Sequence, residues 1–484
     1  MSTARIIAWN TGVQAVGKAV STLFGVAIIA LMTRYLGQEG FGHYSTANAF
    51  FQILAIVLDL GINVTLVQML GERAGDEKYE NRAISATMTF RIVTAFVLLG
   101  SAPFIGLLFP YAWQVKVALF AIWVSFFSAS LNQIVIGVQQ RHLKMSAVAI
   151  SEVVGRAVLL VGLLVCMAMG WGLIPVVVFV SFGSTANLVI NWLVARRYAS
   201  FEWNWDPAFW KIMLGRSWPI GVSIIFNLAY FKADTFILSL VRSASEVGLY
   251  GAAYRVLEIL ITFPFMLAGV VLPLMSHAWA RKNQERFSTL VRQSLTAMGL
   301  IAVPLAGGVA VIGTQAMTLI AGPDFAASGD ILKILSLATA VIYIGTISSH
   351  VVVAVNAQLK MLPVYAAAGI LTVIAYVWLI PIYGMWAAAW LTVVSEVIVA
   401  AAATYITIKA APRSFDGWTW LKILFAGAVM MLCILPLKDF WLPVPIVAGA
   451  IVYSAIILLT GAISRGTLKE LLAMKKGEQL IETP

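Results

Sequence analysis

The amino-acid sequence predicts an all-α integral membrane protein of about 14 transmembrane helices, built by internal duplication. Three observations lead to this prediction. Hydrophobic residues make up 61% of the 484-residue chain and charged residues only 11%, with a mean hydropathy of +0.93, whereas soluble domains carry about 25% charged residues. Apolar runs of membrane-spanning length recur along the whole chain. A short segment of the first half also returns in the second half.

Fourteen apolar runs are separated by charged or turn-rich breaks, and each is close to the roughly 20 residues that cross a bilayer as a helix. The first run contains Lys18 and is too long for a cleaved signal peptide. The predicted spans are 8–34, 44–70, 84–109, 115–138, 146–169, 174–195, 213–240, 247–274, 292–313, 331–354, 362–380, 385–408, 421–437 and 443–463.

Basic residues are concentrated on one side of the predicted membrane. The tail and loops on the side that holds both termini carry 21 of the 32 lysines and arginines. The opposite loops carry five, Arg34, Lys116, Arg242, Lys333 and Lys438. The positive-inside rule therefore predicts that both termini are cytoplasmic. The net charge of +11 follows from this topology and from contact with anionic lipid, so we expect no nucleic-acid partner.

The repeated segment reads GFGHYSTANAFFQIL at 40–54 and EVGLYGAAYRVLEIL at 246–260, 206 positions later. Each copy is a short Gly-Tyr turn on the non-cytoplasmic side, between the first two helices of a half. This placement indicates duplication, and direct repeats in membrane proteins are typical of transporters. The matching pairs are Gly42 and Gly248, Tyr44 and Tyr250, Ala47 and Ala253, Ile53 and Ile259, and Leu54 and Leu260.

Polar side chains form stripes on one face of several predicted helices. For their Ser, Thr and Asn members, hydrogen bonding between helices and lining of a cavity are both open. Charged members are costly in a bilayer, which favours a cavity or an ion pair. The stripes are Asn10, Gln14, Lys18 and Thr22; Asn48, Gln52, Asp59 and Asn63; Ser223, Asn227, Tyr230 and Asp234; and Arg255, Glu258 and Thr262, with Tyr250 and Tyr254 nearby.

Depth in the membrane predicts partners for some of these charges. Lys18 and Asp59 lie at similar depth, about 15 Å from the cytoplasmic ends of the first two helices, so we expect them to meet. Glu152 and Arg156 are four residues apart on one helix, which predicts a local ion pair. Lys232 and Asp234 point to opposite sides of their helix, and the polar stripe favours Asp234 as the residue that faces the cavity.

The sequence contains no metal-ligand spacing, phosphate loop or nucleotide fingerprint. We therefore expect no cofactor, no metal site and no catalytic residue. Cys166 and Cys433 lie far apart within apolar spans, where we expect them to pack as small apolar residues.

The run TRYLGQEGFGHYSTANAFFQI at 33–53, after a helix with Asn10, Gln14 and Lys18, resembles the opening of the polysaccharide-transport, or Wzx-type, flippases. These belong to the multidrug/oligosaccharidyl-lipid/polysaccharide (MOP) superfamily. The second copy, VGLYGAAYRVLE at 247–258, resembles the start of that family's second lobe. The resemblance implies pseudo-symmetric six-helix lobes at 1–211 and 212–411 around a central cavity, followed by two helices and a cytoplasmic tail at 412–484.

The resemblance also implies a function, which is not enzymatic. A Wzx-type flippase of the bacterial inner membrane moves an oligosaccharide on undecaprenyl diphosphate from the cytoplasmic to the periplasmic leaflet, for O-antigen, capsule or exopolysaccharide synthesis. Its partners would include the polymerase and chain-length regulator of the pathway. The diphosphate would need cationic partners, which Lys18 and Arg255, together with Lys232 or Arg34, would supply. The candidate cavity residues are Lys18, Gln14, Asn10, Asn48, Gln52, Asn227, Lys232, Arg255 and Tyr254, and the candidates for ion coupling or ion pairing are Asp59, Asp234 and Glu258.

Three other functions remain open on the sequence alone. A multidrug and toxin extrusion antiporter shares the superfamily fold but normally has twelve helices, so the spans 421–437 and 443–463 count against it. A polymerase or membrane glycosyltransferase of the same pathway usually carries a large external loop or a soluble catalytic domain, and this chain has neither. A lipid II flippase of the same superfamily is a weaker match.

Overall fold

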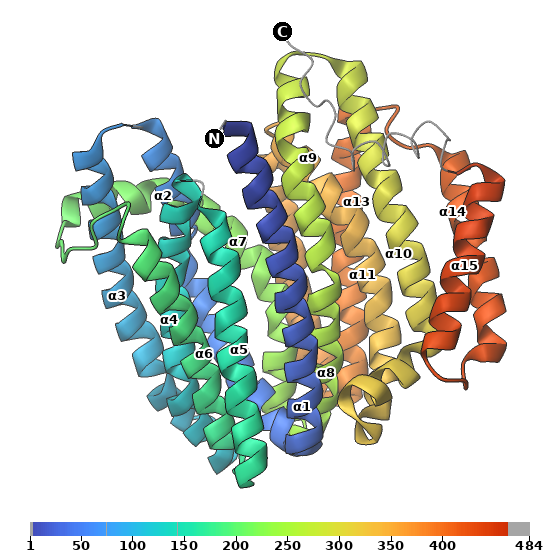
Figure 1. Cartoon of the computed structure of the whole chain (residues 1–484), viewed down its shortest axis with the longest axis horizontal. Helices are drawn as coiled ribbons and strands as arrows, with labels where there is room; N and C mark the ends of the chain where they lie inside the picture. Colours follow the sequence, from blue (N-terminus) through green and yellow to red (C-terminus); the bar gives the residue numbers. More distant parts are fainter. Residues whose placement is uncertain (1–2, 74, 143, 463–484) are drawn as a thin grey trace. The chain divides into compact units, whose positions relative to one another are not determined.

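The structure is a computed structural model that describes residues 3–73, 75–142 and 144–462. Within these ranges every regular element is a helix (Figure 1). The α-helices are α1 Thr3–Asp59, α2 Ile62–Glu72, α3 Glu77–Leu107, α4 Trp113–Arg141, α5 Met145–Met169, α6 Leu173–Ala195, α7 Pro207–Val241, α8 Ala244–Leu260, α9 Thr262–Ala280, α10 Gln284–Ala321, α11 Ala326–Ala354, α12 Gln358–Tyr383, α13 Met385–Ala410, α14 Gly417–Ile434 and α15 Pro443–Thr460. Two short 3-10 helices, Pro323–Phe325 and Leu435–Leu437, complete the set.

The predicted membrane fold is confirmed. Among the described residues, 12 helical stretches are long and apolar enough to cross a bilayer. The first, Val16–Glu72, contains two predicted spans, because α1 breaks at Gly37 (φ 66°, ψ −177°), a backbone conformation that glycine adopts readily. Helices α8 and α9 together form one such stretch, Ala244–Ala280, and α7 covers the predicted span 213–240. The described residues thus contain the 14 membrane-spanning helices expected.

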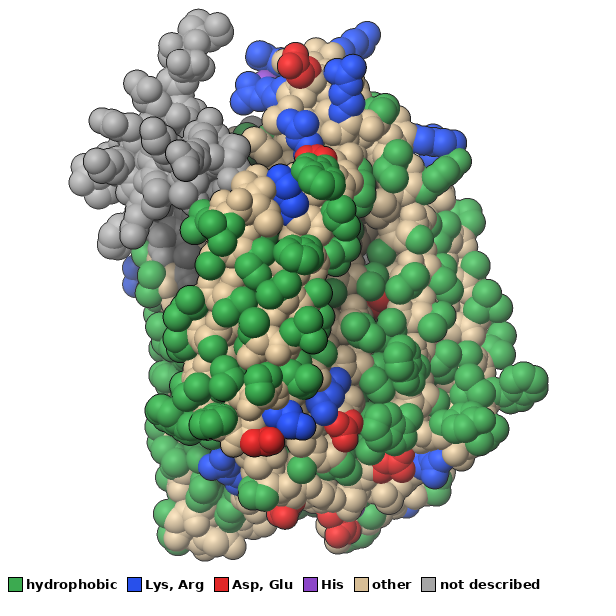
Figure 2. All heavy atoms as spheres, turned by 90° about the vertical axis from the view of Figure 1, so that its right-hand side faces the viewer, with side chains coloured by type: hydrophobic (Ala, Val, Ile, Leu, Met, Phe, Trp, Pro, Cys, Tyr) green, Lys and Arg blue, Asp and Glu red, His purple; other side chains and the backbone are tan. Residues whose placement is uncertain are grey.

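Apolar side chains cover the surface where these helices would meet lipid. Figure 2 shows a broad green band of them on the face that carries α14 and α15, with most of the charged side chains above and below it. Trp378 and Leu459 are among the large apolar residues exposed in this way. Cys433 on α14 is also exposed, contrary to the prediction, whereas Cys166 on α5 is buried as expected.

The helices group into two compact units. Unit 1 comprises Met1–Ile259, Thr318–Ile331 and Leu362–Ser395, and unit 2 comprises Leu260–Met317, Leu332–Met361 and Glu396–Pro484. In unit 1, α4 and α5 both pack on α6, and α5 also packs on α1 (Figure 1). In unit 2, α14 packs on α15, and hydroxyl groups join α11 to α13 at Ser348 and Thr404, 3.0 Å apart. The lobe boundaries derived from the resemblance stay a prediction.

Hydrogen-bonding side chains join α4 to α6 at four successive levels. This is the interhelical bonding that the sequence left open for uncharged polar residues, since a hydroxyl or amide in hydrocarbon needs a protein partner. From one end to the other the contacts are Ser125 with Ser184 at 2.6 Å, Ser128 with Thr185 at 3.1 Å, Asn191 Nδ2 with Asn132 Oδ1 at 2.9 Å, and Gln139 Nε2 with the Asn191 carbonyl at 2.8 Å.

Helix α1 ends inside the second predicted span, which the sequence treats as continuous. Leu60 (φ 45°) and Gly61 (φ 69°) are left-handed, and α2 begins at Ile62. Arg91 of α3, 1% exposed, satisfies the carbonyls that this break frees. Its guanidinium donates to the Leu58 carbonyl at 2.7 Å and to the Asp59 carbonyl at 3.4 Å. A buried arginine thus takes the place of the water that would otherwise solvate a helix end.

The extended segment 200–206, between α6 and α7, is held along one face of α3. Asn81, Ser85 and Thr89 are four residues apart on that helix and accept hydrogen bonds from the backbone amides of Ser200, Glu202 and Asn204 at 2.9, 3.2 and 2.9 Å. At the end of the segment, Asp206 accepts from Arg82 Nε at 2.7 Å and from the Phe209 amide at 3.0 Å, which caps α7.

The Asp206 carboxylate should contribute stability that disappears in acid. The hydrogen bond from Arg82 lowers the pKa of Asp206. A carboxyl with a lowered pKa stabilises the fold above its unfolded pKa, about 3.9, and this contribution is lost as the pH falls through the folded value. We expect Asp206→Asn, which keeps a capping oxygen, to lower the unfolding temperature less than Asp206→Ala, since losing a cap costs about 1 kcal/mol.

Thermal unfolding of the detergent-purified chain at pH 7 and at pH 3 checks this. In both variants the unfolding temperatures at pH 7 and at pH 3 should differ by less than they do in the original chain. An unchanged difference in the variants would remove Asp206 as its source.

Candidate functional site

The charged site candidates that the structure describes all lie in unit 1, and four of them, Lys18, Lys232, Arg255 and Glu258, belong to two clusters that each hold a shared carboxylate. We call them the α1–α5 triad (Lys18, Glu152 and Arg156) and the α7–α8 triad (Lys232, Arg255 and Glu258). In each triad two cations share one carboxylate, so each group of three carries a net positive charge within an apolar part of the chain.

The α1–α5 triad is centred on Glu152. Its Oε1 lies 3.3 Å from Lys18 Nζ and 3.1 Å from an Arg156 nitrogen, and it accepts from the Ser21 hydroxyl at 2.8 Å. Arg156 also donates to the Ser21 carbonyl at 2.7 Å and contacts α1 where a Cβ on Gly25 would fill the space. The local pair predicted between Glu152 and Arg156 is therefore confirmed, and it extends to α1.

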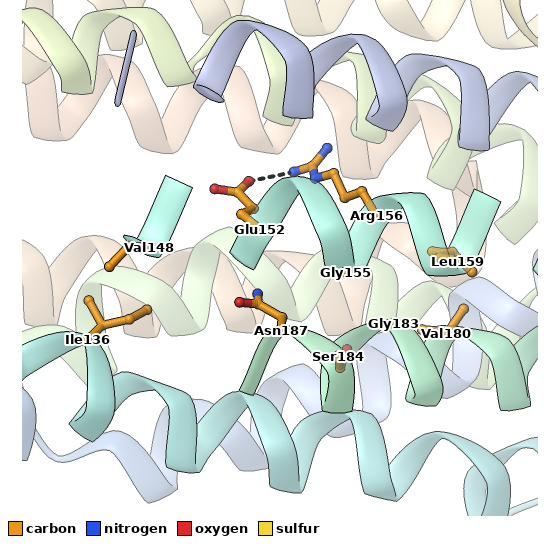
Figure 3. A pocket seen from close by; sticks show the side chains of 10 residues that line it. All are labelled: Ile136, Val148, Glu152, Gly155, Arg156, Leu159, Val180, Gly183, Ser184 and Asn187. Carbon is orange, nitrogen blue, oxygen red and sulfur yellow. Dashed lines mark hydrogen bonds and ion pairs between the residues drawn. The ribbon is translucent and has the colours of Figure 1, made fainter. Parts of the chain in front are cut away.

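A cavity of about 400 Å³ adjoins this triad between α4, α5 and α6. Glu152 and Arg156 line it from α5, and Asn187 and Ser184 line it from α6 (Figure 3). In Figure 3 the two charged side chains lie on one side of α5, joined by their ion pair, while Asn187 projects from α6. The cavity thus combines charges with amide and hydroxyl groups, the mixture that a glycan phosphate requires.

The predicted contact between Lys18 and Asp59 is wrong. Lys18 pairs with Glu152, and the Asp59 carboxylate lies 3.5 Å from Arg91 at the end of α1. The depth argument compares positions along the membrane normal only, so it could not show which helices are neighbours. Helix α1 packs on α5, and α1 ends at Asp59, just before the left-handed residues Leu60 and Gly61.

The α7–α8 triad is centred on Glu258, whose two oxygens pair with different cations. Oε1 pairs with Lys232 of α7, and Oε2 pairs with Arg255 of α8 at 2.8 Å. The Lys232 ammonium also lies 5.0 Å from the centre of the Tyr254 ring, close enough for a cation–π contact. Tyr254 in turn donates its hydroxyl to the Phe231 carbonyl.

A small cavity of about 20 Å³ borders this second triad, with room for roughly one water molecule. Arg255, Glu258 and Tyr254 line it from α8, and Asn48 and Gln52 line it from α1. These five residues were sequence candidates, and the structure brings them together from both halves of the chain. In this conformation the cavity is too small for a sugar.

Asp234 and Lys232 are arranged contrary to the sequence-based preference. Asp234 is fully buried and accepts from the Tyr250 hydroxyl at 2.5 Å. Lys232, on the other side of α7, contacts the cavity-lining Glu258. Lys232 and Asp234 are two residues apart and lie on opposite sides of α7, as expected. Asp234, however, uses its place in the polar stripe to contact Tyr250 of α8 and does not line the cavity.

The other cavity candidates are divided between structural contacts and residues outside the description. Arg34 donates to the Leu319 carbonyl at 2.5 Å near the end of α10, so it satisfies a helix terminus. Gln14 is half-buried on α1. The side chains of Asn10 and Asn227 lie outside the described part of the chain.

The two copies of the sequence repeat pack directly against each other. A Cβ on Gly42 of α1 would overlap the Ala244 carbonyl, and a Cβ on Gly248 of α8 would overlap the Gln38 carbonyl. These contacts are reciprocal, because Gln38 and Ala244 each lie four residues before their own glycine. The repeat is therefore a close helix crossing, which only residues without a side chain allow. The prediction of a Gly-Tyr turn in each copy is wrong, because 40–54 lies within α1 and 246–260 within α8.

Asn187 and Ser184 were not among the sequence candidates. Both project from α6, and Asn187 and Asn191 form one face of that helix with Ser184. That spacing was visible in the sequence, but a stripe without a charge gave no reason to prefer a cavity over interhelical bonding.

Comparison with known proteins identifies the family. The family model described as "Polysaccharide biosynthesis protein" matches residues 7–279, more than half of the chain. The chain belongs to this family. A second family model, MatE, matches residues 219–379 of this chain. Together the two confirm the resemblance to polysaccharide flippases of the MOP superfamily.

Relatives of this family member match at low identity over long stretches. "Probable flippase AglR" of Haloferax volcanii is 23% identical, with 97% of this chain and 99% of the relative aligned. A "Putative O-antigen transporter" of Shigella flexneri is 24% identical over 63% of this chain and 73% of its own length. All of these names describe flippases or transporters.

Solved structures show the same fold at 15% identity or less. "Lipid II flippase MurJ, inward closed conformation" has a TM-score of 0.77 and covers 93% of this chain and 98% of its own. An inward-facing MATE family transporter has a TM-score of 0.66, with 81% and 94% covered. The fold is therefore that of the MOP superfamily.

The revised pairing of Lys18 can be measured by crosslinking. In a background without Cys166 and Cys433, we expect Lys18→Cys with Glu152→Cys to react with a short bifunctional thiol reagent in native membranes. Lys18→Cys with Asp59→Cys should react far less, because Asp59 faces Arg91 of α3 and Lys18 faces Glu152 of α5. Gel mobility reports the reaction, and the opposite order of yields would restore the contact predicted from the sequence.

Proposed function

We propose that this chain is a flippase that moves a polyprenyl-diphosphate-linked oligosaccharide from the cytoplasmic to the periplasmic leaflet of a bacterial inner membrane. The observation that carries the proposal is the pair of triads, each of which sets two cations against one carboxylate. Membership of the polysaccharide biosynthesis family and the full-length match to a probable flippase support it.

A diphosphate cannot cross hydrocarbon without cationic partners, because burying an uncompensated charge costs several kcal/mol or more. In the resting triads Lys18, Arg156, Lys232 and Arg255 are held by carboxylates, which keeps the empty site from carrying unpaired charge. An arriving diphosphate would exchange with the carboxylate for one cation of each pair. Arginine suits this exchange because its planar donors match phosphate oxygens.

The sugar and the lipid make different demands. Hydroxyl-rich sugars need donors and acceptors, which Asn187 and Ser184 supply at the larger cavity and Asn48 and Gln52 at the smaller one. The polyprenyl tail would remain in the bilayer beside the protein. No bond is made or broken, so the chain acts as a transporter.

Transport would proceed by alternating access, with the Gly42–Gly248 crossing as the closed outer side. The repeat lies on the non-cytoplasmic side by the charge rule, and its packing leaves no space for a substituent. Opening to the periplasm would separate α1 from α8 here. Both termini would be cytoplasmic, and the polymerase and chain-length regulator of the pathway would be partners.

Among the acidic residues, Asp234 and Glu258 remain our candidates for coupling to an ion gradient. Asp234 is buried with a single tyrosine hydroxyl and the amide and hydroxyl of Thr235 as donors. Glu258 bridges two cations that the substrate would also contact. Asp59 serves the end of α1 with Arg91, which makes it a structural residue in this proposal.

Removing a cation from each triad tests the function. We expect Lys18→Ala and Arg255→Ala to abolish surface glycan display, with lipid-linked oligosaccharide accumulating inside the cell and the protein still inserted in the membrane. Arg255→Lys should retain part of the activity, because it keeps the charge but loses the planar donors. Lys438→Ala, an exposed residue outside the triads, serves as the control.

Reconstitution separates this function from its rivals. The purified chain in proteoliposomes should move a fluorescent polyprenyl-diphosphate oligosaccharide across the bilayer. The match of residues 219–379 to the MatE model makes a cation antiporter the second candidate. Drug efflux with normal glycan display in both triad variants would favour the antiporter and sink the flippase proposal.

The glycine crossing gives a further prediction with an internal control. Replacing a helical glycine by alanine normally stabilises a helix by about 1 kcal/mol. We expect Gly42→Ala and Gly248→Ala to reduce both stability and transport, because the new Cβ meets a backbone carbonyl of the other copy. Gly100→Ala, where a Cβ would meet nothing within 4 Å, should be neutral or stabilising. Unfolding temperature and glycan display measure the two effects, and equal behaviour of all three variants would show that the crossing is loose.

A further inference from the structure

Cationic side chains surround a cavity of about 530 Å³ in unit 1, and no residue of either triad lines it. Helix α4 ends there at Arg141, followed by His142, and α6 ends there at Ala195, followed by Arg196 and Arg197. These four side chains line the cavity, and Glu77 and Glu80 at the start of α3 lie across from them. We call it the basic-end cavity.

Two of its arginines have no acidic partner. Within the described ranges neither Arg141 nor Arg197 forms an ion pair, and the buried Nε of Arg141 has no hydrogen-bond acceptor. Attraction to a helix C-terminus explains an arginine at such a position. It does not explain a buried donor left unsatisfied, which destabilises the fold.

The acidic residues of the cavity balance only part of this charge. Glu80 Oε1 lies 3.0 Å from His142 Nε2, a contact that is an ion pair only when the imidazole is protonated. Three arginines against Glu77 and Glu80 leave the cavity lining with a net positive charge, which favours an anion in the cavity.

The surroundings place the cavity at the level of lipid head groups. The Arg196 guanidinium lies 5.3 Å from the ring centre of Trp192, which is exposed on α6. Trp203 and Trp205 are exposed on the neighbouring segment 200–206. Exposed tryptophans are typical of the lipid–water interface. Tyr198 completes the wall, stacked on His142 with the ring centres 5.3 Å apart.

The cavity is also preformed. Segment 200–206 is fixed to α3, and the Ser200 amide donates to Asn81 at 2.9 Å, with both residues in the cavity wall. A ligand would therefore not have to order the chain before binding, which favours affinity.

We propose that the basic-end cavity binds the phosphodiester head group of an anionic phospholipid of the surrounding leaflet. Arginine forks match the two free oxygens of a phosphodiester, and basic pockets between membrane helices on the cytoplasmic side bind such head groups. The bound lipid would satisfy Arg141 and hold the ends of α4 and α6 to the start of α3. This role goes beyond transport and does not depend on which glycan is moved.

Lipid binding to the purified full-length chain tests the proposal. In a neutral detergent, we expect phosphatidylglycerol to remain bound in native mass spectrometry and to raise the unfolding temperature, and phosphatidylcholine to do neither. The triple variant Arg141→Gln, Arg196→Gln and Arg197→Gln should bind phosphatidylglycerol roughly tenfold more weakly or worse, because charge-assisted hydrogen bonds are lost. Arg197→Gln alone, at an exposed position, should fold normally and show a smaller loss in the same direction.

The matched control removes the same charge elsewhere. Arg281→Gln, Lys282→Gln and Arg286→Gln, all exposed in unit 2, should leave phosphatidylglycerol binding unchanged. An equal loss in both triple variants would show that net charge rather than the cavity holds the lipid, and would overturn the proposal. Inorganic phosphate that displaces the lipid at comparable concentrations would also overturn it, since the site would then take a free phosphate.

Discussion

Hydrocarbon offers no partner to a charge or to an unpaired backbone group, and this constraint governs every polar residue that the chain places between its apolar surfaces. The clearest case is Arg91, which is 1% exposed. It donates to the carbonyls of Leu58 and Asp59, which the end of α1 leaves without a helical partner. The same requirement explains why the two triads are each held together by a carboxylate. A buried cation must be stabilised by a partner, or the helices around it would not pack.

The number of membrane-spanning helices could be predicted from the sequence because it depends on composition along the chain. Apolar runs mark the spans, and the bias of basic residues toward alternate loops supports the count. The lateral order of the helices does not depend on composition in this way. Similar predicted depths favoured a contact between Lys18 and Asp59, yet Lys18 meets Glu152, because α5 rather than the end of α1 lies beside it. The break at Leu60 and Gly61 was also invisible, since both residues are common in membrane helices.

The candidate site was predictable where a charge accompanied the polar stripe. Arg255, Glu258, Asn48 and Gln52 do line one cavity. Uncharged stripes were ambiguous for a physical reason, because the same amides and hydroxyls serve equally well to join helices. On α6, Ser184 takes part in both, bonding Ser125 of α4 and lining the cavity beside Glu152. Only the position of the neighbouring helix decides between these roles, and the spacing of polar residues along one helix does not predict that position.

The reciprocal packing of Gly42 and Gly248 bears on how such a chain came about. Each copy of the repeat contacts the other through equivalent atoms, glycine against the carbonyl four residues before its counterpart. This is the pattern of an isologous interface, in which one surface patch meets a second copy of itself. Two half-length chains could have paired here as a homodimer before their genes were joined. After fusion the two patches were free to differ in charge, as Ala49 and Arg255 do, but not in size at the point of contact.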